Sequence, residues 1–486
     1  MSAIMLRHEA HFYSRISGLA ACLLCLYLMF SPVWLPSIAP RMYDNSRILE
    51  LTALCLLSLF ALAPALSRSI GQAWLGLTPP VRWLLVIFLI GGAFSALASE
   101  AKQVGIQQIA LNVQLLALCL MVCAIVRNRG AAVEKALAIA IFAGAGLVVL
   151  KFWVTYVLYF LEGKAFSWVS PFMDFANVRF FGQYQAYALL LMLLPAAVMD
   201  LKGLRRYLVY FVAANFWAMQ WMVGTRAVWV GFVVAMVATT IALPQKRMQW
   251  IAGQIAPALI GGVIFALFSW LIQDSPKATQ IPAINSIVER SGESNRERVT
   301  LARSAFELIV EHPLTGVGPG QFGMHYSKTA AAHPHNSPLQ LLVEYGIPAG
   351  GAAIALGALL MVYVLRQIRR RSLQKFDAPG TILGAALIMG LVDALFSGNL
   401  TMPYGQVFLS VAAGWMIGRQ RPEPPAPYVP VERQRQLEVA VAGTAVLAAL
   451  VTAVLAIEYV SLIREMPYPP NLRIPSFWQY GRFSAW

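Results

Sequence analysis

The chain has 486 residues, of which 59% are hydrophobic and only 12% are charged, and its mean hydropathy is +0.64. Soluble globular domains are about one-quarter charged, so this composition excludes that class and indicates a polytopic membrane protein. The period-two alternation that a transmembrane barrel needs is absent. The formal net charge of +15 is spread over separate loops, so we expect no nucleic-acid partner.

Thirteen apolar segments follow one another along the chain, and each is long enough to cross a bilayer as a helix. They lie near residues 14–35, 47–66, 81–98, 105–126, 132–160, 182–200, 206–222, 225–243, 250–272, 338–365, 380–396, 402–418 and 437–460. The sequence therefore predicts an all-α polytopic membrane protein with about 12–13 transmembrane helices. No small-residue cleavage site follows the first segment, so we interpret it as a retained anchor. The last segment is either a span or a surface element.

These segments divide the chain into four parts, which are N-terminal transmembrane helices (1–272), a long loop (273–337), C-terminal transmembrane helices (338–460) and a tail (461–486). Lysine and arginine concentrate in alternate loops, and the positive-inside rule assigns those loops to the cytoplasm. The short outer loops carry only Arg41, Arg47, Lys102, Lys164, Arg179 and Arg226. This bias places loop 273–337, and the tail if the last segment spans, on the outer side. All five cysteines lie in apolar segments, so no disulfide is expected in the loop.

The second half of the outer loop has the pattern of an amphipathic helix. Apolar side chains recur at helical spacing at Val299, Ala302, Phe306 and Ile309. We predict a helix over 296–311, capped by Ser294 or Asn295 and ended by Pro313. Three arginines lie on this helix, and Arg296 and Arg303 share a face while Arg298 points elsewhere.

A glycine-rich segment, "GVGPGQF", follows at 316–322. On its own it is more typical of a tight reversal between two packed elements. The functional alternative is a close backbone approach to a phosphate, whose oxygens accept exposed N–H groups. Gly318 would be the central residue of such a site.

Four of the six histidines lie between His312 and His335. Ser337 followed by Pro338 predicts an N-cap and a proline in the first turn of a long membrane helix. His335 therefore lies just ahead of a helix N-terminus, where free N–H groups attract anions and disfavour an imidazolium. For His312 and His325 we favour an interfacial role without chemistry.

Two arginines at the outer membrane edge, Arg179 and Arg226, are unexpected under the positive-inside rule. Snorkelling is one explanation, and a polar site at membrane depth is the other. Lys151 and Asp393 are weaker candidates for such a site. The sequence has no Asp-x-Asp pair of the kind that holds a hard cation, so we expect arginines instead of a metal and no cofactor. A basic outer pocket suits a lipid diphosphate.

The segment "HPLTGVGPGQF", the pair His335–Asn336 with Gly346 following, and the upstream arginines together resemble the O-antigen ligase and polymerase superfamily. The resemblance covers about Arg179 to Gly350 and is greatest to the ligases, which join polysaccharide from undecaprenyl diphosphate to lipid A–core. The family pattern ends in Gly-x-x-Gly, whereas here position 349 is Ala and the glycine comes at Gly350.

The resemblance implies a C-type glycosyltransferase fold, inversion at the anomeric carbon and metal-independent catalysis. It implies that His335 is the base and that Arg179, Arg226 and Arg298 bind the diphosphate. Arg296, Arg303, His333, Asn336 and Gly318 are secondary candidates.

The expected function is that of an O-antigen ligase in lipopolysaccharide biosynthesis. It would act on the periplasmic side of the bacterial inner membrane, among membrane lipids, with an undecaprenyl-diphosphate-linked glycan as donor and lipid A–core as acceptor. O-antigen polymerase and protein O-oligosaccharyltransferase activities share the donor and remain open. A lipid–glycan transporter is the non-enzymatic alternative, although a polar cluster on one side favours a reaction site.

Overall fold

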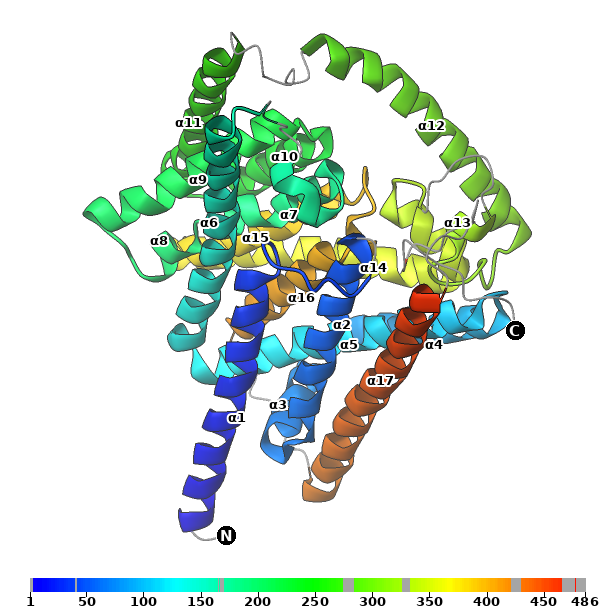
Figure 1. Ribbon diagram of the computed structural model, residues 1–486. Coiled ribbons are helices and arrows are strands. Elements are labelled where there is room, and N and C mark those ends of the chain that lie inside the picture. Colours follow the sequence, from blue (N-terminus) through cyan, green and yellow to red (C-terminus); the bar gives the residue numbers. More distant parts are fainter. Residues whose placement is uncertain are drawn as a thin grey trace.

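A computed structural model describes residues 3–39, 42–164, 166, 170–273, 284–325, 333–420, 430–465 and 477. All regular secondary structure in these residues is helical, with no strand (Figure 1). The predicted all-α class is therefore confirmed. Most of the predicted tail, and residues 274–283 and 326–332 of the predicted outer loop, lie outside the described residues.

The helices before the outer loop are α1 (Ala3–Phe30), α2 (Met42–Leu59), η1 (Phe60–Leu62), α3 (Pro64–Leu75), α4 (Pro79–Ala98), α5 (Lys102–Arg129), α6 (Ala131–Leu161), η2 (Ser170–Phe175), α7 (Val178–Leu191), α8 (Leu194–Val198), α9 (Gly203–Val223), α10 (Arg226–Ala242) and α11 (Arg247–Gln273). The remaining helices are α12 (Ile284–Glu311), α13 (Phe322–His325), α14 (Ser337–Gln374), α15 (Ala378–Asp393), η3 (Asn399–Thr401), α16 (Pro403–Gly418) and α17 (Val431–Glu465). Each of the thirteen predicted apolar segments falls on one or more of them.

Nine helices of the described chain are long and apolar enough to cross a membrane, and α17 is one of them. The sequence predicted about 12–13, and the difference has a physical reason. The apolar helices α10 and α15 have 17 and 16 residues, and at 1.5 Å per residue they reach only ~24–26 Å. Helix α16 has 16 residues and is as short as α15, whereas the predicted span 182–200 falls on α7 and α8, which together form one of the nine.

Helices α7, α10 and α15 approach closely at glycines. A Cβ atom on Gly182 of α7 would lie 2.6 Å from the hydroxyl of Thr225, which precedes α10. A Cβ atom on Gly231 of α10 would lie 2.7 Å from the backbone oxygen of Met389 in α15. These contacts bring the first turns of α7 and α10 together beside α15.

The predicted helix of the outer loop is present but longer, since α12 runs from Ile284 to Glu311 and arches away from the other helices, on the side remote from the N-terminus (Figure 1). Ser294 and Asn295 lie inside it, so the predicted cap is wrong. The helix ends before Pro313, as expected.

The buried face of α12 also differs from the predicted one. Val299 and Phe306 are 70% and 60% exposed. Ile309 is buried and Ala302 is half-buried, and the other buried residues are Leu301 and Ala305, which the prediction did not include. They pack with Val317, Phe322, Leu339 and Val343, so the helix rests on the glycine-rich segment and on the first turns of α14.

Helix α14 is interrupted at Gly346, whose backbone has φ 76° and ψ 169°. The segment 313–322 fills this break. The N–H of Ile347 donates to the oxygen of Pro313 at 2.8 Å, and the N–H of Val317 donates to the oxygen of Val343 at 2.9 Å. The segment is thus joined to α14 on both sides of the break.

A buried carboxylate completes this junction. Glu344 is 2% exposed, and its side chain accepts the N–H groups of Gly320 at 2.9 Å and Phe322 at 3.4 Å. The N–H of Gly318 donates to the backbone oxygen of Glu344 at 3.0 Å. These N–H groups are used within the protein, so the glycine-rich segment is a tight reversal, and Gly318 does not present its N–H to a phosphate.

We predict that Gly346→Ala destabilises the protein by about 1–3 kcal/mol, the cost of a side chain in a backbone region that only glycine adopts readily. An added Cβ would also collide with the backbone oxygen of Leu314. Gly351→Ala is the matched control in the same helix, since a Cβ there meets nothing within 4 Å. Denaturant unfolding of the detergent-solubilised variants measures both, and equal stability of the two would contradict the prediction.

Candidate functional site

Two of the candidate arginines lie in the first turns of neighbouring helices. Asn177 caps α7, and its Oδ1 accepts the N–H groups of Arg179 at 2.8 Å and Phe180 at 3.1 Å. Arg226 is the first residue of α10 and follows Gly224, which has a left-handed backbone with φ 63°. Both arginine side chains are exposed. The positive ends of two helix dipoles therefore lie beside two exposed guanidinium groups, and both kinds of positive charge favour an anion there.

The third arginine comes from the outer-loop helix. Arg298 is half-buried, and its Nη2 donates to the backbone oxygen of Phe396 at 3.4 Å, just beyond the end of α15. Arg303 is exposed and pairs with Glu307 at 3.2 Å. Arg296 is also exposed. Of the three arginines on this helix, the structure brings Arg298 to the other site residues.

Asn336, and not Ser337 as predicted, caps α14. Its Oδ1 accepts the N–H of Leu339 at 2.8 Å, while its Nδ2 donates to the oxygen of Leu395 at 2.9 Å. Ser337 is the first helical residue, and its N–H and hydroxyl donate to the backbone oxygens of Ala394 and Ser397. The start of α14 is thus bound to the segment that follows α15.

His335 precedes this cap and has a left-handed backbone with φ 54°. Its N–H donates to Nδ1 of His333 at 3.2 Å, and the two rings lie edge to face with centroids 4.3 Å apart. His333 is buried against Gly398, where a Cβ would lie 2.8 Å from its Nε2. His333 is therefore a positioning residue for the backbone of His335.

Burial lowers the pKa of His335 to about 4, and the guanidinium groups of Arg179 and Arg298 act in the same direction. Burial, His335 and Arg179 lower the pKa of His333 to about 3. The pKa of Arg298 is lowered by its burial and then by Arg226 and Arg179. Both imidazoles are neutral at pH 7, as the sequence suggested for His335, although burial and arginines supply the cause.

These couplings define one site, made by Arg179, Arg226, Arg298, His333 and His335. The site contains three guanidinium groups and is bordered by the first turns of α7, α10 and α14. Within the described chain none of the three arginines forms an ion pair with a carboxylate. Such an arrangement binds an anion with more than one negative charge and keeps a neutral imidazole beside it.

One segment that holds this site was not predicted from the sequence. Residues 394–398 follow α15 and accept hydrogen bonds from Arg298, Asn336 and Ser337. Their contribution is through backbone oxygens, which no motif encodes. The weaker candidates are used elsewhere, because Lys151 pairs with Asp174 and Asp393 accepts the hydroxyl of Ser397 at 2.6 Å.

No group of three or more His, Cys, Asp or Glu side chains is arranged to hold a metal ion in the part of the chain that the structure describes. The charged groups that act on His335 are arginines.

Comparison with known families identifies one domain. Residues 211–354 match the family model described as O-antigen ligase. This family is shared by O-antigen ligases and polymerases, which are glycan-transferring enzymes, and the resemblance read from the sequence is confirmed. The matched range contains Arg226, Arg298 and His335, whereas Arg179 precedes it. No curated protein matches the chain.

We predict that Arg298→Gln raises the pKa of His335 from about 4 towards its ordinary value of about 6.5, because one of two positive charges that disfavour the imidazolium is removed. NMR titration of protein labelled at histidine Cε1 measures this shift, and the His335 signal is assigned by its loss in His335→Gln.

Arg303→Gln is the matched control, since Arg303 lies on the exposed face of the same helix and is paired with Glu307. An unchanged His335 titration in Arg298→Gln, or an equal shift in both variants, would contradict the proposed coupling.

Proposed function

We propose that this chain, which carries an O-antigen ligase domain, is a C-type glycosyltransferase that moves polysaccharide from undecaprenyl diphosphate to lipid A–core. The observation that carries the proposal is the meeting of Arg179, Arg226 and Arg298, from three separate helices, beside the neutral imidazole of His335. Guanidinium groups stabilise a diphosphate leaving group, and a neutral imidazole accepts the proton of an acceptor hydroxyl.

The arginines bind the donor diphosphate. A guanidinium group matches phosphate oxygens bidentately and remains charged at any physiological pH. Three such groups neutralise a diphosphate, including the charge that develops as it leaves, so the reaction proceeds without a divalent metal. The first turns of α7, α10 and α14 add their dipoles to the same field.

His335 takes the proton of the acceptor hydroxyl. The hydroxyl oxygen attacks the anomeric carbon, the bond from that carbon to the diphosphate oxygen breaks, and the configuration inverts. The bound diphosphate places negative charge beside the arginines and offsets their effect on His335. This raises the pKa of His335 above its value of about 4 in the free protein. Donor binding thus converts a weak base into one suited to neutral pH.

We place this site on the periplasmic face of a bacterial inner membrane. The basic side chains that the sequence assigned to inner loops, such as Lys202, Lys246, Arg371 and Arg419, lie near the start of α9, the start of α11 and the ends of α14 and α16. The candidate site lies at the opposite ends of these helices. Arg226 follows the end of α9, and Phe396, which accepts the hydrogen bond of Arg298, follows the end of α15. The charge asymmetry of the bundle supports this orientation.

The identity of the acceptor distinguishes a ligase from a polymerase and from a protein O-oligosaccharyltransferase. Reconstitution with a labelled undecaprenyl-diphosphate glycan and one acceptor for each activity tests it. Transfer to lipid A–core supports the ligase. Transfer only to a second lipid-linked glycan, or only to a pilin-like protein, would replace it with a polymerase or a protein O-oligosaccharyltransferase. Glycan movement across vesicles without any acceptor would favour a transporter. A chelator arm tests the metal-independent mechanism, which loss of activity in EDTA and its recovery with magnesium would overturn.

We predict that Arg179→Gln, Arg226→Gln and Arg298→Gln each weaken donor binding by about 1.5–3 kcal/mol, the contribution of one hydrogen bond to a charged group. This corresponds to about 10–150-fold in Kd. Displacement of a fluorescent lipid diphosphate from the purified protein measures the loss. Arg303→Gln is again the control, and a donor affinity that is equal in all four variants would remove the three arginines from the diphosphate site.

We predict that His335→Ala lowers kcat by about 10²–10⁴-fold, the contribution typical of a positioned base, and leaves donor binding intact. His312→Ala, an exposed histidine outside the site, should retain full activity. Near-normal turnover by folded His335→Ala, or a product with retained configuration, would refute the assignment.

The pH profile of the wild-type enzyme tests the same residue. The base must be neutral, so activity is lost as pH falls through its pKa. The acid limb of kcat should lie at higher pH than that of kcat/KM for the donor, since only kcat reports the donor complex.

A further inference from the structure

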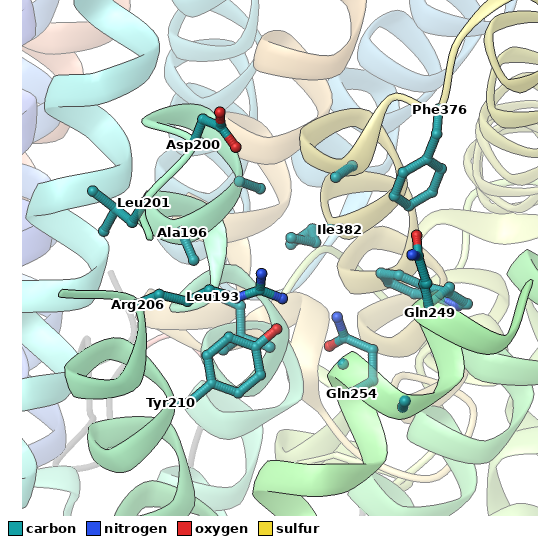
Figure 2. Close-up of a pocket in the computed structure, with 15 residues that line it drawn as sticks. Leu193, Ala196, Asp200, Leu201, Arg206, Tyr210, Gln249, Gln254, Phe376 and Ile382 are labelled. Atoms are coloured by element: carbon teal, nitrogen blue, oxygen red, sulfur yellow. The ribbon is translucent and has the colours of Figure 1, made fainter. Parts of the chain in front are cut away.

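A second polar region lies at the other end of the helix bundle. An open cavity of about 620 Å³ is lined by α8, α9, α11 and the start of α15 (Figure 2). Its polar lining comes from Asp200, Arg206, Tyr210, Gln249 and Gln254. The volume is within the range of ~300–1,000 Å³ that ligand pockets usually have.

This cavity is separate from the glycan-transfer site. Ala378 and Ile382, in the first turns of α15, line it, whereas the arginine and histidine site contacts residues beyond the last turn of that helix. The 16 residues of α15 span ~24 Å at 1.5 Å per residue. No reacting group of the donor site reaches the cavity across that distance.

The side chains of the cavity suit an anion that also carries hydroxyl groups. Arg206 lies over the ring of Tyr210, with 5.6 Å from its Cζ to the ring centroid, and Figure 2 shows Arg206 and Gln254 directed into the same space. Gln254 is only 4% exposed, and its Oε1 has no hydrogen-bond partner in the described structure. A buried acceptor of this kind is stabilised by a donor from a ligand.

The surroundings of the cavity are basic. Lys202, Arg205, Lys246, Arg247 and Lys375 lie within three residues of lining residues on the same segments. The carboxylate of Asp200 is 90% exposed and lies 3.8 Å from Lys202, which offsets its negative charge at the rim of the cavity. The summed field at this end of the bundle favours an anionic ligand.

The helices that form the cavity also present apolar faces outward. Leu204, Leu208 and Phe211 of α9 are more than half exposed, as are Met248 and Leu259 of α11. In a chain with this many candidate spans, such faces lie against acyl chains. A ligand in the cavity thus has hydrocarbon beside it and basic groups around it.

We propose that the cavity binds the headgroup of an anionic glycerophospholipid of the inner leaflet. The phosphate is bound by Arg206, the glycerol hydroxyls donate to Gln254 and contact Tyr210 and Gln249, and the acyl chains lie along α9 and α11. Lipid bound there fastens α8, α9, α11 and α15 to one another at the end remote from glycan transfer.

Native mass spectrometry of the full chain in detergent tests the proposal with phosphatidylglycerol, phosphatidylcholine and soluble glycerol 3-phosphate as probes. Phosphatidylglycerol should bind in preference to phosphatidylcholine, whose choline cation faces the basic rim and has no hydroxyl donor. Arg206→Gln should lower its affinity at least about tenfold, the loss expected for one charge-assisted hydrogen bond.

Arg205→Gln is the matched control, because Arg205 is the neighbour of Arg206 and is exposed as Arg206 is, but does not line the cavity. Equal losses in the two variants would show general attraction to basic loops and would overturn the site. Equal binding of both lipids would do the same. Glycerol 3-phosphate that binds as tightly as the lipid would overturn the lipid assignment. Donor binding at the other end should be unchanged in both variants, which keeps this test independent of the proposed transfer reaction.

Discussion

The junction between Glu344 and the glycine-rich segment is the interaction on which the arrangement of the arginine and histidine site depends. The buried carboxylate accepts two backbone N–H groups of that segment, and the break at Gly346 makes room for it. The segment then offers Val317 and Phe322 to Leu301 and Ala305 of α12. Arg298 is one turn from Leu301 on that helix. The packing of α12 on the glycine-rich segment therefore fixes the position of Arg298, although none of the packed residues belongs to the site.

A second consequence is electrostatic. Arg179, Arg226 and Arg298 repel one another, and burial adds to the penalty for His335 and Arg298. This arrangement is unfavourable in the free protein, and a bound anion would relieve it. Under the proposed function that anion is the donor diphosphate, and part of its binding free energy would be the removal of repulsion already present in the fold, which is a form of preorganisation. The same repulsion keeps His335 neutral in the free protein.

The sequence predicted the helical class and the position of every apolar segment, because a run of apolar residues has few structural alternatives in a membrane. It was wrong about the buried face of α12, where Val299 and Phe306 are exposed. Periodicity gives the spacing of a face but does not say which of two apolar faces finds a partner. It also assigned the cap of α14 to Ser337, whereas Asn336 takes that role because both sides of its amide find backbone partners. The backbone oxygens at 394–398 that hold the site have no signature in residue type.

Several arginines elsewhere in the described chain differ from those of the candidate site, because they are paired with carboxylates. Arg47 lies in a segment that the sequence assigned to the outer side, yet it is fully buried and paired with Glu50, and it stacks on Phe477. At the ends of α14 and α16, Arg371 and Arg419 share the carboxylate of Asp377. These arginines serve the fold, and carboxylates of the fold balance their charge. Within the described chain Arg179, Arg226 and Arg298 form no ion pair with a carboxylate, and under the proposed function a donor diphosphate would balance their charge.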